Sequence, residues 1–240
     1  MKRLPTKSQN FLRKPSLVKT LAGHSNLKKT DTVYDIGAGS GIISSVLAER
    51  CSRVIAVEHD ARMITTLRDN VAKFDNVEVV VGDALTFALP DNEYKVFANI
   101  PFHLSSPIVR RLTETTNPPS AIYLIVQKQF AQKLLIGDYS FTGLLGAFIA
   151  PLFEVRIRYK LDRTDFWPHP AVDTVFIELL RRKSPLLPST DMPRYRAFVE
   201  QCFSRQKYFA TLGVGDVKPS EMTAEQWLKL FKAKGLKQSK

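Results

Sequence analysis

Residues 99–102 (Asn-Ile-Pro-Phe) combine groups that could hold an aromatic amine for alkylation. The exocyclic amine of adenine is a poor nucleophile because its lone pair is delocalised into the ring. Two acceptors for its protons, the Asn99 side-chain carbonyl and the Ile100 main-chain carbonyl, would localise that lone pair. Pro101 would stiffen the turn, and Phe102 would stack on the base. The segment predicts catalysis by positioning and electrostatics; alternatively, Asn99 caps a turn and Phe102 belongs to the core.

A glycine-rich loop and two acids suggest a site for a nucleoside-containing cofactor. In residues 35–41 (Asp-Ile-Gly-Ala-Gly-Ser-Gly), Gly37 and the later glycines let the backbone approach a ligand closely. Glu58 and Asp83 end predicted strands, where they could bind ribose hydroxyls and an adenine amino group. The plainer interpretation of the loop is a tight turn. Its third glycine comes one residue early for a dinucleotide fingerprint, and Asp35 fits a methyltransferase.

A parallel sheet is needed to bring these residues together. Short apolar runs predict strands at 32–36, 54–57, 77–81, 95–99 and 121–126. Helical patterns separate them, at 42–50, 61–72, 107–112 and up to residue 135. Two later runs, 152–159 and 172–180, predict an antiparallel pair that finishes the sheet. The pattern is typical of a doubly wound α/β fold with a seven-stranded, mostly parallel sheet.

The charge of the chain is concentrated at its two ends. The formal net charge of +12 divides into +8 for residues 1–30, −4 for residues 31–180 and +8 for residues 181–240. Two basic ends suggest a polyanionic partner such as nucleic acid. The plainer interpretation is a pair of solvated, solubilising tails.

A linker around Pro185 and Pro188 predicts two domains. We expect a catalytic domain at residues 1–183. Residues 184–240 are expected to form a small, basic, helical domain, because two helical patterns, at 193–203 and 223–234, follow the linker. The positive charge of this segment suggests an RNA-binding domain.

Composition excludes several classes of protein. Hydrophobic residues at 44% and charged residues at 24% exclude wholesale disorder. Cys51 and Cys202 cannot make a disulfide framework, and neither they nor the four histidines have metal-ligand spacing, so no metal is expected. No signal peptide is apparent, and the most apolar stretch, residues 143–153, is too short to span a bilayer. We expect a soluble cytoplasmic protein with no membrane partner.

Six segments in order resemble the motifs of the ribosomal RNA adenine dimethyltransferases. They are residues 8–12, 35–41, 56–60, 82–83, 99–102 and 166–174 (Phe-Trp-Pro-His-Pro-Ala-Val-Asp-Thr). The resemblance covers residues 8–180. It implies a class I (Rossmann-like) methyltransferase fold and methylation of an adenine 6-amino group with S-adenosylmethionine. A sulfonium cofactor is already activated, so no strong general base is required.

The resemblance also implies roles for individual residues. Those that would contact the cofactor are Asn10, Leu12, Gly37, Glu58, Asp83 and Asn99. Gly37 would contact its methionine portion, and Glu58 would hold both ribose hydroxyls. Asp83 would bind the adenine amine, and Asn99 would contact both the cofactor and the target amine.

Several basic residues are candidates for RNA contacts. Lys7, Arg13 and Lys14 flank the cofactor segment, and Arg110 and Arg111 follow the predicted catalytic loop. Each could contact RNA phosphates beside the pocket, although exposed Lys and Arg side chains are usually only solvated.

The family has two main arms, and three features resemble the erythromycin-resistance (Erm) arm. Ile100 stands where the small-subunit enzymes usually carry Leu, the C-terminal domain is short, and residues 203–207 (Phe-Ser-Arg-Gln-Lys) replace a more basic run. The resemblance implies a monomer that methylates one single-stranded loop adenine in the peptidyl-transferase region of 23S rRNA. Resistance to macrolides, lincosamides and streptogramin B would follow. The alternatives are a small-subunit rRNA dimethyltransferase, a non-catalytic RNA-binding relative and, more distantly, a dinucleotide oxidoreductase.

Overall fold

The computed structural model describes residues 10–137 and 141–236, so Lys7 lies outside the described residues. The chain divides into two compact units: Met1–Lys128 with Ile157–Leu179, and Gln129–Arg156 with Leu180–Lys240. The chain passes from one unit to the other for the last time at Leu180, close to the boundary expected after residue 183. Residues 129–156, however, group with the C-terminal residues and not with the predicted catalytic domain.

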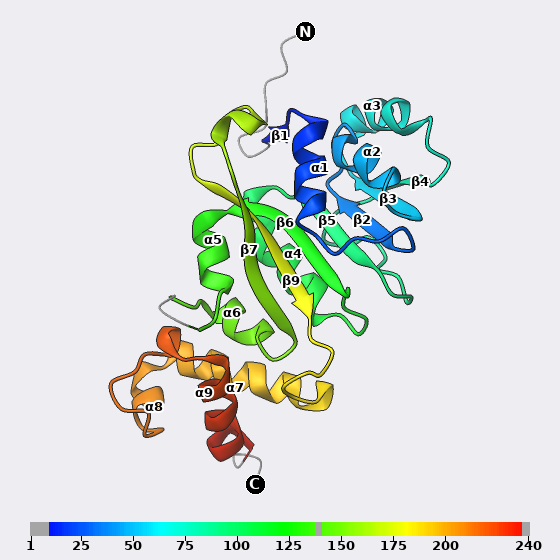
Figure 1. The fold of residues 1–240 in the computed structure, drawn as a ribbon. Coiled ribbons are helices and arrows are strands. Elements are labelled where there is room, and N and C mark those ends of the chain that lie inside the picture. The colour runs from blue at the N-terminus through cyan, green and yellow to red at the C-terminus, as the bar shows by residue number, and fades with distance from the viewer. Residues whose placement is uncertain (1–9, 138–140, 237–240) are drawn as a thin grey trace. The chain divides into compact units, whose positions relative to one another are not determined.

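A seven-stranded sheet in the order β4-β3-β2-β5-β6-β9-β7 confirms the predicted fold class (Figure 1). Its strands are β2 (Thr32–Ile36), β3 (Arg53–Glu58), β4 (Val77–Val81), β5 (Lys95–Asn99), β6 (Ala121–Gln127), β7 (Phe153–Leu161) and β9 (Thr174–Arg181). Strands β4, β3, β2, β5 and β6 pair in parallel. Strands β9 and β7 are neighbours at the end of the sheet, where the last two runs were expected.

Burial along the central strands explains why the sheet is covered on both faces. Strand β6 is buried from Ala121 to Val126, and β5 from Lys95 to Ala98, so side chains on both faces avoid water. The helices of this unit are α1 (Pro15–Gly23), α2 (Ile42–Ala48), α3 (Ala61–Val71) and α4 (Ser105–Glu114), with the 3-10 turns η1 (Phe102–Leu104) and η2 (Arg163–Asp165). Helix α1 packs against α2, and α2 against α3.

Helix α3 begins at a cap that follows β3 directly. The Asp60 side chain accepts a hydrogen bond from the Arg62 amide at 3.0 Å, which satisfies one of the free N–H groups of the first turn. Its buried face includes Met63, Leu67 and Val71, which recur at helical spacing. This face lies toward the glycine-rich loop.

A two-residue strand near the N-terminus ties the start of the chain to a distant segment. Strand β1 (Phe11–Leu12) pairs antiparallel with β8 (Phe166–Trp167) in a separate two-stranded sheet. Phe11 is opposite Trp167, and Leu12 is opposite Phe166. The Arg13 amide adds a hydrogen bond to the Asp165 carbonyl at 3.0 Å. These contacts hold the N-terminal segment in place ahead of α1.

The second unit is helical and has its own core. Its helices are α5 (Lys128–Leu134, from Gln129 on), α6 (Leu144–Ile149), η3 (Ser189–Asp191), α7 (Met192–Ser204), α8 (Gln206–Ala210), η4 (Pro219–Glu221), α9 (Ala224–Leu230) and the π-turn η5 (Phe231–Gly235). Ala147 and Phe148 of α6 are buried in one cluster with Tyr195 and Trp227, and the Tyr195 hydroxyl donates to the Ala147 carbonyl at 3.0 Å. The burial of α6 explains why residues 129–156 group with the C-terminal helices. Over the described residues, no helix combines the length and apolar character needed to cross a bilayer.

Candidate functional site

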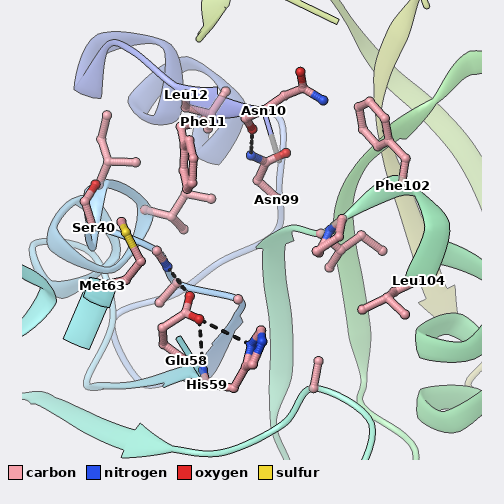
Figure 2. A pocket seen from close by; sticks show the side chains of 18 of the residues that line it. Asn10, Phe11, Leu12, Ser40, Glu58, His59, Met63, Asn99, Phe102 and Leu104 are labelled. Atoms are coloured by element: carbon pink, nitrogen blue, oxygen red, sulfur yellow. Dashed lines mark hydrogen bonds and ion pairs between the residues drawn. The ribbon is translucent and has the colours of Figure 1, made fainter. Parts of the chain in front are cut away.

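A cavity of about 380 Å³ lies at the carboxyl ends of β2, β3 and β5, and its lining is drawn in Figure 2. In the sheet β2 lies between β3 and β5, and the strand order reverses there, because β3 and β4 lie on one side of β2 and β5 and β6 on the other. Ligands of open α/β sheets bind at such a switch point. All nine residues predicted as catalytic or cofactor-binding line it: Asn10, Leu12, Gly37, Glu58, Asp83, Asn99, Ile100, Pro101 and Phe102. Residues that are far apart in sequence are therefore brought to one site.

The glycine-rich loop adopts a backbone that side chains disfavour. Gly37, Gly39 and Gly41 have φ angles of 75°, 57° and 85°, in the left-handed region that glycine enters without strain. The amides of Gly37 and Ala38 donate to the Val57 carbonyl at 2.8 and 3.0 Å, which fastens the loop to the end of β3. A Cβ on Gly37 would meet no atom closer than 4.0 Å, so this position faces open space.

Glu58 ties the loop to the start of α3. Its side chain is buried, and Oε2 accepts from the Gly39 amide at 2.8 Å. Oε1 accepts from the His59 and Asp60 amides at 2.8 and 2.9 Å. Three of about four lone-pair positions of the carboxylate are filled by main-chain donors. One regular position on Oε2 remains for a ligand hydroxyl, fewer than the two ribose contacts expected from the sequence.

Asp83 follows β4, lines the cavity and is exposed. Its Oδ1 accepts a hydrogen bond from the Leu85 amide at 2.6 Å, which leaves Oδ2 as the oxygen that could bind a ligand amine.

Asn99 is oriented by the N-terminal segment. Its Nδ2 donates to the Asn10 carbonyl at 2.7 Å, as the dashed line in Figure 2 shows. A carbonyl can only accept, so the Asn99 amide must present its nitrogen to Asn10 and its Oδ1 to the opposite side. In Figure 2 that oxygen points toward the side of the cavity where the Phe102 ring lies. Phe102 is half-buried, as a side chain with one open face would be.

Asp35 lies behind the glycine-rich loop and does not line the cavity. It is fully buried, and its Oδ2 accepts from the Ser44 hydroxyl of α2 at 2.6 Å. Its Oδ1 has no hydrogen-bond partner among the residues that the structure describes. Burial raises the pKa of Asp35 to about 7, a shift that the Ser44 hydrogen bond partly opposes and the charge of Glu58 increases.

Asp35 makes the stability of the protein depend on pH. The unfolded chain releases this proton near pH 3.8 and the folded chain near pH 7, so between these values the folded state binds more protons. The free energy of unfolding should therefore fall as pH rises through this window, by about 2 kcal/mol between pH 5.5 and 8. Urea unfolding of the wild type and of Asp35→Asn at both pH values measures it. Equal pH slopes for the two proteins would contradict this origin.

The predicted RNA-contacting residues fall into different environments. Arg13 and Lys14 are exposed directly after β1. Arg110 is exposed on α4, and its guanidinium lies 3.3 Å from the Glu114 carboxylate. Arg111 instead donates to the Ala84 and Phe87 carbonyls and lies 4.5 Å from the Phe87 ring centroid. These contacts give Arg111 a structural role, in holding the segment after β4, in place of the RNA contact that was expected from the sequence.

The cavity also has apolar walls that sequence reasoning missed. Phe11, Ile42, Ile43, Met63 and Leu104 line it. Phe11 could have been found, because it lies between Asn10 and Leu12 in the N-terminal motif. Met63 and the two isoleucines have no distinguishing signal, since apolar residues at helical spacing are normally core. Figure 2 shows Phe11 and Met63 on the same side of the cavity, near Ser40.

Other candidate chemistries find no support in the described part of the chain. No group of three or more His, Cys, Asp or Glu side chains is arranged there to hold a metal ion. Cys51 and Cys202 are buried free thiols, and burial raises their pKa values to about 11 and about 12. Protonated thiols are poor nucleophiles.

Comparison with known proteins decides the family. Residues 4–211 match the family model of the ribosomal RNA adenine dimethylases. The chain belongs to this family. An rRNA adenine N-6-methyltransferase of Saccharopolyspora erythraea is 32% identical over 93% of the chain, which spans 63% of the length of that protein. A ribosomal RNA small subunit methyltransferase A of Streptococcus agalactiae is 31% identical over 76% of the chain and 67% of its own length.

The solved structures agree with this assignment. The crystal structure of the 23S rRNA methyltransferase ErmE has a TM-score of 0.80 and 31% identity, over 93% of the chain and 98% of ErmE. As a member of the ribosomal RNA adenine dimethylase family, the protein is an S-adenosylmethionine-dependent rRNA adenine N6-methyltransferase. The expectations of family, fold class and enzyme class are thereby confirmed.

Proposed function

We propose that the cavity binds S-adenosylmethionine and that the target is an adenine of 23S rRNA. The lining residues fit this cofactor. They include Glu58 and Asp83 but, among the described residues, no lysine or arginine. A dinucleotide would bring a pyrophosphate that needs cationic or N–H partners, whereas S-adenosylmethionine carries a positive sulfonium that acidic side chains attract. The left-handed Gly37 leaves open space where the methionine portion would lie.

The residues of the cavity suit a reaction at an aromatic amine. S-adenosylmethionine, when bound, supplies a methyl group activated by the sulfonium. Asn99 Oδ1, whose direction is fixed by the hydrogen bond from Asn99 Nδ2 to the Asn10 carbonyl, and the Ile100 carbonyl accept hydrogen bonds from the two N–H groups of the adenine amine. Phe102 stacks on the base, which fixes the plane of the ring. This arrangement of Asn99 toward Asn10 is the single observation that carries the proposal, because it leaves a fixed acceptor facing the target.

The choice of 23S rRNA as the target rests on similarity to known enzymes. ErmE, described as a 23S rRNA methyltransferase, is similar over nearly its full length, and Ile100 favours the same arm. The small-subunit enzyme of Streptococcus agalactiae is about as similar in sequence but over less of the chain. We further propose that residues 184–240 form the basic RNA-binding part, that the protein acts as a monomer, and that its expression confers resistance to macrolides, lincosamides and streptogramin B.

Methylation assays with two substrates test the target. Naked 23S rRNA and intact 30S particles are incubated with the protein and radiolabelled S-adenosylmethionine, and primer extension locates the modified base. We expect incorporation into 23S rRNA with a reverse-transcription stop at one peptidyl-transferase adenine. Incorporation only into the 30S particle would overturn the 23S target and support the small-subunit alternative.

A further inference from the structure

Trp167 presents a large apolar side chain to solvent. Trp167 is 65% exposed, and of the described large hydrophobic residues only Phe141, at 67%, is more exposed. Its neighbour Phe166 is fully buried. Strand β8 thus sends one aromatic side chain into the core and the next one out into water. An exposed indole offers a large, rigid plane on which another ring can stack, so Trp167 is a candidate for a binding role.

The register of β1 and β8 places Trp167 beside the cavity. Phe11 and Trp167 are directly opposite each other in the antiparallel pair, and opposite residues project from the same face of a sheet. Phe11 lines the cavity and lies 3.4 Å from the position that a Cβ on Gly39 would occupy. Asn10, the residue before Phe11, holds the Asn99 amide. The exposed indole therefore continues the aromatic wall of the cavity outward, one strand away from the residue that orients Asn99.

The surroundings of Trp167 limit its motion and add positive charge. The His169 ring lies at 86° to the indole, with ring centroids 6.3 Å apart. His169 is in turn held by a 2.8 Å hydrogen bond between its Nδ1 and the Arg163 carbonyl. The exposed cations Arg13 and Lys14 follow β1 directly. An ordered aromatic plane, on a strand whose partner runs directly into two exposed cations, suits a single nucleic-acid strand, in which bases stack and phosphates are negative.

From this geometry we propose that Trp167 stacks on a nucleobase next to the target adenine while that adenine occupies the cavity. The inference rests on the proposed function, since it assumes that the target enters beside Asn99. A base that leaves its helix to enter a pocket loses its stacking partners, and the nucleotide next to it is left with an exposed face. Trp167 covers that face. Arg13 and Lys14, which follow the strand paired with that of Trp167, bind the adjoining phosphates.

Fluorescence anisotropy with a short labelled oligoadenylate tests Trp167 independently of the rRNA target. Trp167→Ala should weaken binding by about 5- to 150-fold, the range expected for one lost base-aromatic stack. Trp167→Phe should keep the affinity within about threefold, because phenylalanine also stacks on bases. On the rRNA that the wild type methylates, Trp167→Ala should raise KM with little change in kcat, since it lies outside the reacting centre.

Two controls separate the possible failures. Phe141→Ala removes an equally exposed aromatic side chain and should leave RNA affinity unchanged. Isothermal titration with S-adenosylhomocysteine should give the same Kd for the wild type and for Trp167→Ala, which shows that the variant is folded. Wild-type affinity of Trp167→Ala for oligoadenylate would overturn the inference and point to a protein partner for the indole. Failure of the proposed function appears differently, as absence of methylation of 23S rRNA by the wild type.

Discussion

Asn99→Ala should reduce kcat for methyl transfer by about 10²- to 10³-fold or more while binding of RNA and cofactor persists. The loss of one preorganised polar group at a reacting centre has an effect of this size. Alanine removes the Oδ1 acceptor for the target amine and also the 2.7 Å bond to the Asn10 carbonyl. Single-turnover methylation with saturating RNA measures the chemical step, and filter binding and calorimetry measure the two ligands.

Two further variants show which property of Asn99 matters. Asn99→Asp keeps an acceptor oxygen but turns a carboxylate toward the Asn10 carbonyl, so we expect activity between the wild type and Asn99→Ala. Asn117→Ala is the matched control. Its side-chain amide also donates to main-chain carbonyls, those of Pro90 and Asn92 at 2.8 and 2.9 Å, but it is absent from the cavity lining. Wild-type kcat for Asn99→Ala would refute the catalytic assignment and favour a non-catalytic RNA-binding protein.

Gly41→Ala should destabilise the protein by about 2–5 kcal/mol, the sum of a left-handed backbone and an overpacked contact. The φ of Gly41 is 85°, and a Cβ there would lie 2.7 Å from Leu67 Cδ1 and 3.2 Å from Val71 Cγ1. Both contacts belong to the buried face of α3, which cannot move away without disturbing the core. For a chain of this length the expected loss in Tm is roughly 5–15 °C, measurable by circular dichroism.

Gly37→Ala separates the two contributions. Its φ of 75° imposes a similar backbone cost, but a Cβ would meet nothing closer than Pro101 Cδ at 4.0 Å. We expect only about 1–2 kcal/mol of destabilisation, from the backbone alone. If both variants lowered Tm equally, the close approach of the added Cβ at position 41 to Leu67 and Val71 would not contribute to the loss of stability.

The sheet and the sites at its carboxyl edge were predictable from local pattern. Near-continuous apolar runs such as residues 121–126 require burial on both faces, and strand ends that carry Glu58 or Asn99 must then meet at one edge. The number of hydrogen bonds that each acid already makes was not predictable. Three main-chain N–H groups occupy most of the acceptor positions of the Glu58 carboxylate, and nothing in the sequence around Glu58 indicates that they would.

Interactions over long sequence distances could not be predicted. Strands β1 and β8 have two residues each, too short for any periodicity, and only the folded chain brings them together. Arg111 looked like a phosphate-binding residue because charge alone does not reveal a neighbouring ring. Its guanidinium lies over Phe87 and binds carbonyls after β4, which lie far from it in sequence. Likewise, the apolar pattern of α6 does not say which core it enters.

The pairing of β1 with β8 also determines when the site can be completed during synthesis. Asn10, whose carbonyl orients Asn99, leaves the ribosome early, whereas the strand opposite its neighbour Phe11 emerges only after β7. Closing so long a loop is a late event in folding. A nascent chain that has already formed the parallel strands therefore still lacks an anchored Asn99. With the role proposed for Asn99, the site would be complete only after residues 166–167 have left the ribosome.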